Sequence, residues 1–230
     1  MGKRIIQQAR GKGSLTYRVR KRAYQYTIKY PKTASEAEII SLIHSPAHSA
    51  PLIKLKSQDV IFYIPAFNGA FMGQHINTDG EAKTGNILRV KDIPAGTHIF
   101  NIELNPGDGG KMIRTAGSSA IVLKNEENKV LVSMPNKKEV KLDGECRATI
   151  GVIAGDGRKL KPFVKAGVKF HKMKARNKLW PRTSAVKMNA VDHPFGSGRG
   201  KRIKQKIAKR NAPPGSRVGH IRPRKTGTKR

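Results

Sequence analysis

Short runs of Val, Ile, Thr and aromatic residues, separated by turn residues, fill the middle of the chain. The runs lie at 38–44, 51–57, 59–65, 97–104, 119–124, 129–135, 138–142 and 147–154. Such runs are typical of strands, and no convincing apolar period of about 3.6 residues lies between them. The pattern therefore predicts a series of strands, with one hairpin over 52–65 and a second over 121–135.

Strands at this spacing indicate small barrels or sandwiches. The stretch 80–96 is rich in turn residues and poor in strand signal, which places a boundary near residue 84. We expect a mainly β chain in which an oligonucleotide-binding-type (OB-type) barrel at 36–84 is followed by an SH3-like barrel at 85–158. The flanking residues 1–35 and 159–230 are expected to be basic extensions, the second rich in Gly and Pro.

The charge distribution also separates the centre of the chain from its ends. The formal charge is +32 in total; residues 1–35 hold ten Lys or Arg and no acid, and residues 36–158 are neutral. Residues 159–230 hold twenty-three Lys or Arg and one acid, Asp192. Like charges at this density repel one another, whereas a polyanion neutralises them and releases its counterions. A nucleic acid is therefore the expected partner.

An anionic membrane fits the extensions less well than a nucleic acid does. They carry no sustained amphipathic stripe, and the sequence has no apolar run of about 18 residues. The first ten residues match neither a signal peptide nor a myristoylation signal, so we expect a cytosolic chain.

The N-terminal extension mixes basic residues with tyrosine. Four of the five tyrosines of the chain lie between residues 11 and 31: Tyr17, Tyr24, Tyr26 and Tyr30. Lys and Arg can hold phosphates while tyrosine rings stack on unpaired bases, so the mixture suits RNA loops. The alternative is a basic edge strand whose tyrosines pack on the neutral centre. In the C-terminal extension one short helix is expected at 201–210, a run that also gives weak evidence for nuclear import.

Two glycine-rich stretches, 105–119 and 196–202, could suggest nucleotide hydrolysis. Neither matches the phosphate-binding loop Gly-x4-Gly-Lys-Ser/Thr, because Met112 and Arg202 stand where the motif needs a hydroxyl. Both stretches are instead turns flanked by basic residues, which let a backbone approach phosphates.

Metal ligands with suitable spacing are also missing from the sequence. His44 and His48 are four residues apart, but Pro46 prevents the helix that would place both on one face. A single cysteine, Cys146, excludes an internal disulfide and a Cys-pair zinc site, and it suits a small strand-end residue. We expect no metal and no cofactor.

Asp192 and His193 lie side by side in the stretch NAVDHPFGSGRG (189–200). Adjacent residues rarely converge on one reacting atom, no nucleophile with a supporting motif is near, and an extended arm builds no water-excluding pocket alone. A tight turn fits better: Asp192 accepts backbone N–H bonds, Pro194 stiffens the chain, and glycine allows a positive φ. We therefore expect no catalytic residue and assign loop-ordering roles to Asp192, Pro194 and Gly196.

Several stretches resemble one known family. The stretch NKLWPRTSAVKMNAVDHPFGSGRGKR (177–202) is similar to the signature of the universal large-subunit ribosomal protein L2 family, in which Trp-Pro-Arg leads into Met-Asn-x-Val-Asp/Glu-His-Pro and a glycine cluster. Residues 93–120 and 146–172 also resemble this family. The terminal stretch NAPPGSRVGHIRPRKTGTKR (211–230) resembles its archaeal and eukaryotic branch.

The resemblance implies an OB-type barrel, an SH3-like barrel, and basic extensions threaded into ribosomal RNA near the peptidyl-transferase centre. It implies roles in subunit assembly, subunit association and tRNA binding. The implied partners are large-subunit ribosomal RNA, neighbouring ribosomal proteins, and small-subunit ribosomal RNA at an intersubunit bridge. We expect no membrane partner and no homo-oligomer.

The loop residues of the family fall on four positions of this sequence: Asn189, Asp192, His193 and Pro194. His193 corresponds to a histidine discussed in connection with peptide-bond formation. Phe195 replaces a second histidine common in bacterial members, and Ser197 interrupts the glycine run. A mechanism that needs the second imidazole therefore does not transfer to this chain.

Basic residues of both extensions and of the 105–119 stretch, with a few polar and aromatic ones, are the expected RNA contacts. They are Lys3, Arg4, Arg10, Lys12, Arg18, Arg20, Lys21, Arg22, Lys111, Arg114, Lys172, Lys174, Arg176, Lys178, Trp180, Arg182, Lys187, Asn189, His193, Arg199, Lys201, Arg202, Arg217, Arg222 and Arg224. Two other functions stay open: an RNA-acting enzyme that uses Asp192 and His193, and a general nucleic-acid packaging protein.

Overall fold

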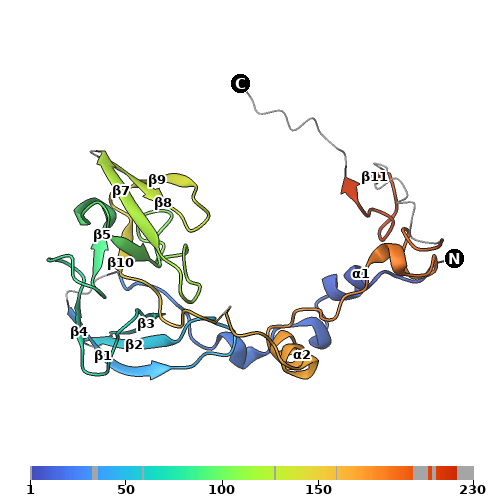
Figure 1. Ribbon diagram of the computed structural model, residues 1–230, viewed down its shortest axis with the longest axis horizontal. Coiled ribbons are helices and arrows are strands. Elements are labelled where there is room, and N and C mark those ends of the chain that lie inside the picture. Colours follow the sequence, from blue (N-terminus) through green and yellow to red (C-terminus); the bar gives the residue numbers. More distant parts are fainter. Residues whose placement is uncertain are drawn as a thin grey trace. The chain divides into compact units, whose positions relative to one another are not determined.

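The computed structural model describes residues 2–32, 36–58, 60–126, 128–158, 160–198, 207–208 and 211–221 (Figure 1). The chain forms two compact units. One, the sheet unit, comprises residues 20–166. The other, the arm unit, joins residues up to 19 with residues from 167 onward, so it is built from both ends of the chain.

The first sheet of the sheet unit is antiparallel and has the strand order β3-β2-β1-β4. Its strands are β1 (Glu36–Ile43), β2 (Leu52–Ser57), β3 (Val60–Pro65) and β4 (His75–Asn77). The hairpin predicted over 52–65 is formed by β2 and β3, which pair from Leu52 opposite Pro65 to Ser57 opposite Val60.

The second sheet is antiparallel as well, with the strand order β5-β10-β6-β7-β8-β9. Its strands are β5 (Ile87–Arg89), β6 (His98–Phe100), β7 (Ala120–Glu126), β8 (Lys129–Ser133), β9 (Glu139–Asp143) and β10 (Arg147–Ile150). The predicted hairpin over 121–135 is formed by β7 and β8. The prediction of a mainly β chain with an OB-type and an SH3-like barrel is thus confirmed.

Two short strands, β4 and β5, were not predicted from the sequence. Each has only three residues, so the alternation of apolar and polar side chains is too brief to stand out. The strand predicted at 97–104 is also shorter than expected, since β6 ends at Phe100. Beyond it, Ile102 forms an isolated bridge with Met112.

Side chains of both sheets share one of the two hydrophobic cores. Ile39 and Ile64 of the first sheet lie in the same cluster as Ile87 and Phe100 of the second, and a second cluster lies within the larger sheet. The sheets occupy residues 36–77 and 87–150. The division at residue 84 stays a prediction, because this common core joins the sheets on either side of it.

The N-terminal residues 20–32 pack on the sheets, which corrects the interpretation of Tyr30 as an RNA-stacking residue. Tyr30 is 2% exposed, and its hydroxyl is hydrogen-bonded to the Asn101 carbonyl (2.8 Å) and to Thr149 Oγ1 (2.6 Å). The ring of Tyr26 lies 5.0 Å from that of Tyr63. For these residues the packing alternative holds, because large aromatic side chains are buried when a core is within reach.

The arm unit contains short helices and one small sheet. Its elements are α1 (Ile6–Gly11), the 3-10 turns η1 (Leu15–Tyr17) and η4 (Ala185–Lys187), and strands β11 (Ile207–Ala208) and β12 (His220–Ile221). Helix α2 (Ala166–Ala175) begins at the last residue of the sheet unit. The sequence pattern predicted neither α1 nor α2.

The prediction of a helix at 201–210 is wrong at residues 207–208, the part of this run that the structure describes. Residues 207–208 form β11, which pairs in parallel with β12. Only two isoleucines supported the helix, and that is too few to define an apolar stripe. Residues 201–206 and 209–210 lie outside the described residues.

Candidate nucleic-acid interface

The N-terminal segment 2–19 and residues 167–198 lie side by side in the arm unit (Figure 1). The N–H of Lys3 donates to the Val191 carbonyl at 2.8 Å, and the side-chain amide of Asn177 donates to the Tyr17 carbonyl. Ile5, the one buried residue of the N-terminal segment 2–19, is 6% exposed. The pairing brings the basic residues of the N-terminal segment next to those of the C-terminal extension.

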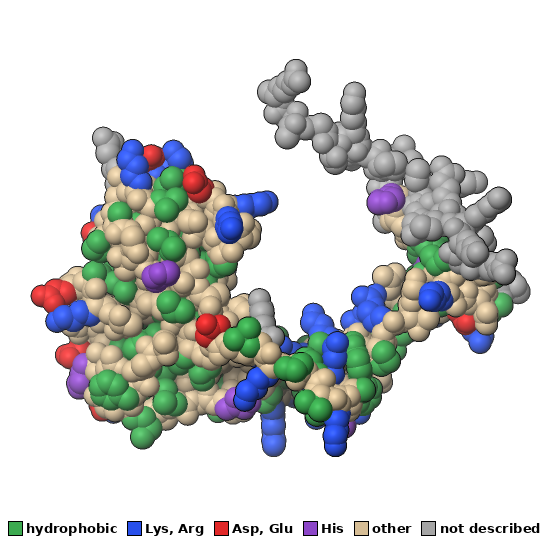
Figure 2. Space-filling view, in the orientation of Figure 1, with side chains coloured by type: hydrophobic (Ala, Val, Ile, Leu, Met, Phe, Trp, Pro, Cys, Tyr) green, Lys and Arg blue, Asp and Glu red, His purple; other side chains and the backbone are tan. Residues whose placement is uncertain are grey.

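The paired segments concentrate positive charge. The described part of the arm unit contains thirteen Lys or Arg and one acid, Asp192. Figure 2 shows Lys and Arg side chains projecting from the arm unit, whereas acidic and basic side chains occur together on the visible face of the sheet unit. Such a surface suits a polyanion, because bound phosphates remove the repulsion between like charges.

Helix α2 ends in a motif that turns the chain toward Trp180. Asn177 has a φ of 51°, its N–H donates to the Lys174 carbonyl, and the N–H of Lys178 donates to the Met173 carbonyl. These two bonds form a Schellman motif, in which asparagine tolerates the left-handed conformation. The Nζ of Lys169 then lies 5.2 Å from the ring centroid of Trp180.

The predicted RNA contacts at 172–187 are brought together in this way. Lys174, Lys178, Arg182 and Lys187 are exposed, while Lys172, Arg176 and Trp180 are partly buried. Within the described residues, the Nε atom of Arg176 is buried and has no hydrogen-bond partner. Leaving such a donor buried without a partner costs free energy, because it has given up its hydrogen bond to water.

The loop at 188–198 is closed by its own backbone. The Asn189 carbonyl accepts the N–H groups of Asp192 (3.0 Å) and His193 (3.2 Å), and the N–H of Ser197 donates to the Met188 carbonyl (3.1 Å). Gly196 passes so close to this turn that an added Cβ would lie 2.6 Å from the Met188 oxygen and closer still to Asn189. Only glycine fits at this position.

His193 and Asp192 contribute to this loop in different ways. The Nδ1 atom of His193 accepts the N–H of Phe195 at 3.0 Å, so Nδ1 carries no proton and Nε2 is the donor. The carboxylate of Asp192 lies 4.0 Å from the Lys3 ammonium; the Lys3 side chain is exposed and that of Asp192 is about half exposed. The described contacts of Asp192 thus include this ion pair with the N-terminal segment and not the backbone N–H bonds that we expected its carboxylate to accept.

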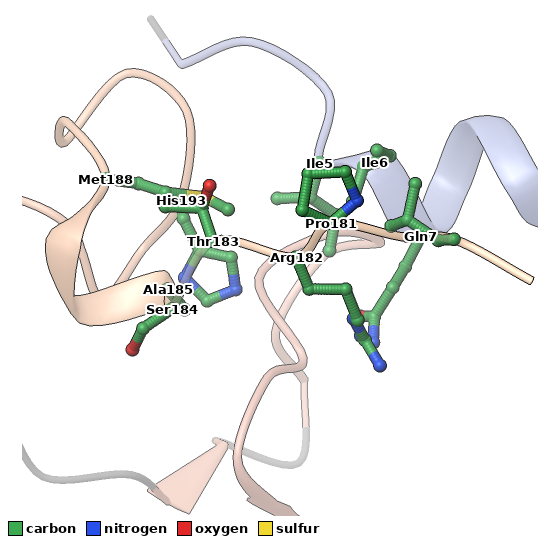
Figure 3. Close-up of a pocket in the computed structure, with 11 residues that line it drawn as sticks. Ile5, Ile6, Gln7, Pro181, Arg182, Thr183, Ser184, Ala185, Met188 and His193 are labelled. Atoms are coloured by element: carbon green, nitrogen blue, oxygen red, sulfur yellow. The ribbon is translucent and has the colours of Figure 1, made fainter. Parts of the chain in front are cut away.

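The imidazole of His193 is the common wall of two cavities. The first, which we call the base cavity, has a volume of about 580 Å³, and Figure 3 shows the imidazole facing residues 183–188 and the N-terminal segment. Its lining residues are Ile5, Ile6, Gln7, Leu179, Pro181, Arg182, Thr183, Ser184, Ala185, Met188 and His193. The second, which we call the cation cavity, has a volume of about 610 Å³ and is lined by Arg4, Ile6, Thr183, Lys187, Met188, Asn189, Asp192 and His193.

The sequence did not single out the apolar walls of these cavities. Ile5, Ile6 and Met188 belong to segments that show no apolar period, and their proximity depends on the pairing of the two chain ends. The Ile5-Ile6 pair inside a basic segment was the one available signal.

Five predicted RNA contacts belong to the sheet unit and not to the arm unit: Arg20, Lys21, Arg22, Lys111 and Arg114. The Arg114 guanidinium donates from Nε to Asn101 Oδ1 (2.9 Å) and from an NH2 to the Ile28 carbonyl (3.1 Å). Arg114 therefore fastens the N-terminal residues to the second sheet. Lys111 lies 3.6 Å from Asp108, and its side chain is exposed.

Five further predicted contacts, Arg199, Lys201, Arg202, Arg222 and Arg224, lie outside the described residues. Within the described ranges, no group of three or more His, Cys, Asp or Glu residues is placed to hold a metal ion. In the same ranges no helix is both long and apolar enough to span a membrane.

Residues 83–215 match the sequence model of a family described as Ribosomal Proteins L2, C-terminal domain. The chain belongs to the ribosomal protein L2 family.

Family members named large ribosomal subunit protein uL2 match along the full length of the chain. The protein of Archaeoglobus fulgidus is 46% identical, with 100% of each chain covered, and that of Hyperthermus butylicus is 43% identical, also with 100% of each covered. The uL2 protein of Korarchaeum cryptofilum is 42% identical over 99% of this chain and 96% of its own. The resemblance to the ribosomal protein L2 family is thereby confirmed.

Proposed function

We propose that the chain is a structural constituent of the large ribosomal subunit that binds large-subunit ribosomal RNA through the arm unit. The observation that carries this proposal is the pairing of two basic segments from opposite ends of the chain, with thirteen Lys or Arg and one acid among the described residues. The names of its relatives give independent support, since they are large ribosomal subunit proteins.

The finer roles follow from the family resemblance. We propose that the chain supports subunit assembly, subunit association and tRNA binding near the peptidyl-transferase centre of a cytoplasmic ribosome. Neighbouring ribosomal proteins and small-subunit RNA at an intersubunit bridge are the further partners. In this proposal the 188–198 loop carries Asn189 and His193 to the RNA, and Gly196 permits the tight turn.

An RNA-acting enzyme based on Asp192 and His193 receives no support from their contacts. The Nδ1 atom of His193, which an acidic partner would orient, is hydrogen-bonded to the N–H of Phe195, and Asp192 is paired with Lys3. A general packaging protein would need no such defined loop. We therefore retain the structural ribosomal role.

The proposal is tested by sedimentation and by the salt dependence of RNA binding. The full chain should sediment with large ribosomal subunits, and the logarithm of its affinity for large-subunit RNA should fall linearly with the logarithm of salt concentration. Replacing both Lys178 and Lys187 by Ala should reduce the magnitude of that slope by about 1.5, because each neutralised phosphate contributes about 0.7–0.9.

Lys129 and Lys138 are exposed in the neutral segment 36–158 and give the matched control, so their double Ala variant should leave the slope unchanged. Sedimentation with free cytosolic protein would contradict the ribosomal role. Equal affinity for duplex DNA would favour a packaging protein, and RNA turnover that disappears in His193→Ala would favour an enzyme.

A further inference from the structure

We propose that the base cavity takes up one unpaired nucleobase of the bound RNA, and that the cation cavity beside it holds the adjoining phosphate. The proposal rests on the RNA-binding function proposed above, and it names the part of the RNA that this site recognises. It follows from four properties of the paired cavities: size, lining, hydrogen-bonding groups and charge.

The size and lining of the base cavity suit a planar heterocycle. Its volume of about 580 Å³ lies within the range of roughly 300–1,000 Å³ that is usual for small-molecule sites. The walls are formed by apolar side chains of both chain ends, among them Ile5, Pro181 and Met188. A base that has left its own helix can be packed between apolar side chains of this kind.

Polar groups at the same cavity can read the edge of a base. The hydroxyls of Thr183 and Ser184 can donate or accept a hydrogen bond, and His193 presents Nε2–H as a donor because its Nδ1 is occupied by the N–H of Phe195. The hydrogen bond from the Phe195 N–H holds the imidazole in one tautomer and one orientation. The site therefore offers a fixed donor beside adaptable hydroxyls.

The cation cavity supplies positive charge beside the base cavity, which an apolar pocket alone would not provide. It shares Ile6, Thr183, Met188 and His193 with the base cavity and adds Arg4 and Lys187. Its one acid, Asp192, lies 4.0 Å from the ammonium of Lys3. A phosphate attached to the bound base would meet two cations there, and this complementarity favours a nucleotide over an uncharged apolar ligand.

A volume-filling substitution tests the site without changing its charge. Ala185 lines the base cavity, and Ala185→Trp should fill it. Ala9 is exposed on α1 and lines neither cavity, so Ala9→Trp is the matched control. Met188→Ala provides a second variant that removes a stacking surface and does not depend on how the larger side chain is accommodated.

The measurement is chemical probing of base edges, nucleotide by nucleotide, on large-subunit RNA bound to each full-length variant. The wild-type chain and Ala9→Trp should protect the same unpaired base. Ala185→Trp and Met188→Ala should raise its reactivity about tenfold, which is the effect of losing one stacked base. Overall RNA affinity and its salt slope should stay within about threefold of wild type, because most phosphate contacts remain.

The proposal would be overturned if every unpaired base that the wild-type chain protects stayed protected in both Ala185→Trp and Met188→Ala. Titration with the four nucleoside 5′-monophosphates separates the two sources of a nucleobase. Tight binding of a free nucleotide, lost in Ala185→Trp while RNA protection is unchanged, would assign the cavity to a free ligand and would also overturn the proposal. Failure of all variants, wild type included, to bind the RNA would instead contradict the function proposed above.

Discussion

Gly196 fixes the shape of the 188–198 loop because no side chain fits between its backbone and the turn at Met188 and Asn189. Gly196→Ala should force these segments apart and cost about 1–3 kcal/mol of local stability, as overpacking does in other tight sites. Hydrogen exchange of the Ser197 N–H, which donates to the Met188 carbonyl, measures this opening. We expect exchange to accelerate by about one to two orders of magnitude.

Gly167 provides the control for this substitution. It lies in α2, and an added Cβ would have no neighbour within 4 Å, so Gly167→Ala should leave the loop unchanged. Unaltered exchange at Ser197 in Gly196→Ala would show that the close approach is not what closes the loop.

Two single residues illustrate what the sequence could and could not indicate. Cys146 was expected at a strand end, and it lies immediately before β10, fully buried. Burial, together with the nearby charge of Asp143, raises the pKa of its thiol to about 11. Ser197 was noted only as a break in a glycine run. Its φ of 81° places it in the left-handed region, a strained conformation that sequence alone could not assign to a serine.

At the scale of elements, the buried Glu103–Arg147 ion pair joins the second sheet to the 105–110 loop and to residues 30–31. Glu103 is 0% exposed, and its carboxylate lies 3.0 Å from the Arg147 guanidinium and accepts the N–H of Gly109 at 2.8 Å. Arg147 in turn donates to the Pro31 carbonyl (2.7 Å) and lies over the Tyr30 ring. One pair of charges thus holds residues 30–31 and the glycine-rich 105–110 turn together.

This ion pair should make the stability of the sheet unit depend on pH. Burial acts to raise the pKa of Glu103, but the hydrogen bonds from Arg147 and Gly109 outweigh it, so the pKa lies below its ordinary value. A carboxyl group with a lowered pKa in the folded state stabilises the fold above its unfolded pKa, about 4.5, and loses that contribution as the pH falls through the folded value. Stability should therefore decline with acidification below about pH 5.

Urea unfolding of wild type and Glu103→Gln at pH 7 and pH 4 tests this expectation. The variant leaves Arg147 without its charged partner and should lose about 3 kcal/mol at pH 7, with a weaker pH dependence. Glu145→Gln removes an exposed carboxylate that pairs with Arg89 and Lys91, and it should have only a small effect. An equal pH dependence in wild type and Glu103→Gln would rule out this carboxylate as the source.

The strands of the sheet unit could be predicted from alternation because each buries one face. Long strands such as β2 and β3 therefore stood out, whereas β4 and β5 depend on pairing with β1 and β10, which a local pattern does not contain. The burial of Tyr30 was missed for the same reason, since its partners Asn101 and Thr149 are 71 and 119 residues away in the sequence. The sequence showed a cluster of tyrosines, but it could not indicate which of them would be buried in the core.

At the scale of the whole molecule, the charge pattern indicated two basic extensions but not that they pair. Among the described residues, the contacts that join them include the Lys3–Val191 and Asn177–Tyr17 hydrogen bonds, the Lys3–Asp192 ion pair and the burial of Ile5. None of these has a sequence signature. The candidate site depends on this pairing, because the base and cation cavities take walls from both segments.

The pairing of like-charged segments should give the free chain and its RNA complex opposite responses to salt. In the free chain, salt screens the repulsion within the arm unit, since the Debye length falls from about 30 Å at 0.01 M to about 3 Å at 1 M. The N–H of Lys3, which donates to Val191, should therefore exchange more slowly as salt is raised. RNA affinity should fall over the same range, because the release of each counterion gains less free energy when the bulk salt concentration is higher.

The N–H of Gly96 is the internal control for this measurement. It donates to the Val122 carbonyl at 2.7 Å within the neutral segment 36–158, so its protection should not respond to salt. If the Lys3 amide exchanged at the same rate at all salt concentrations, or faster at high salt, repulsion would not limit the pairing of the two ends. Opposite trends would instead mean that RNA phosphates replace salt in screening the repulsion, and that the bound RNA stabilises the arm unit with its two cavities.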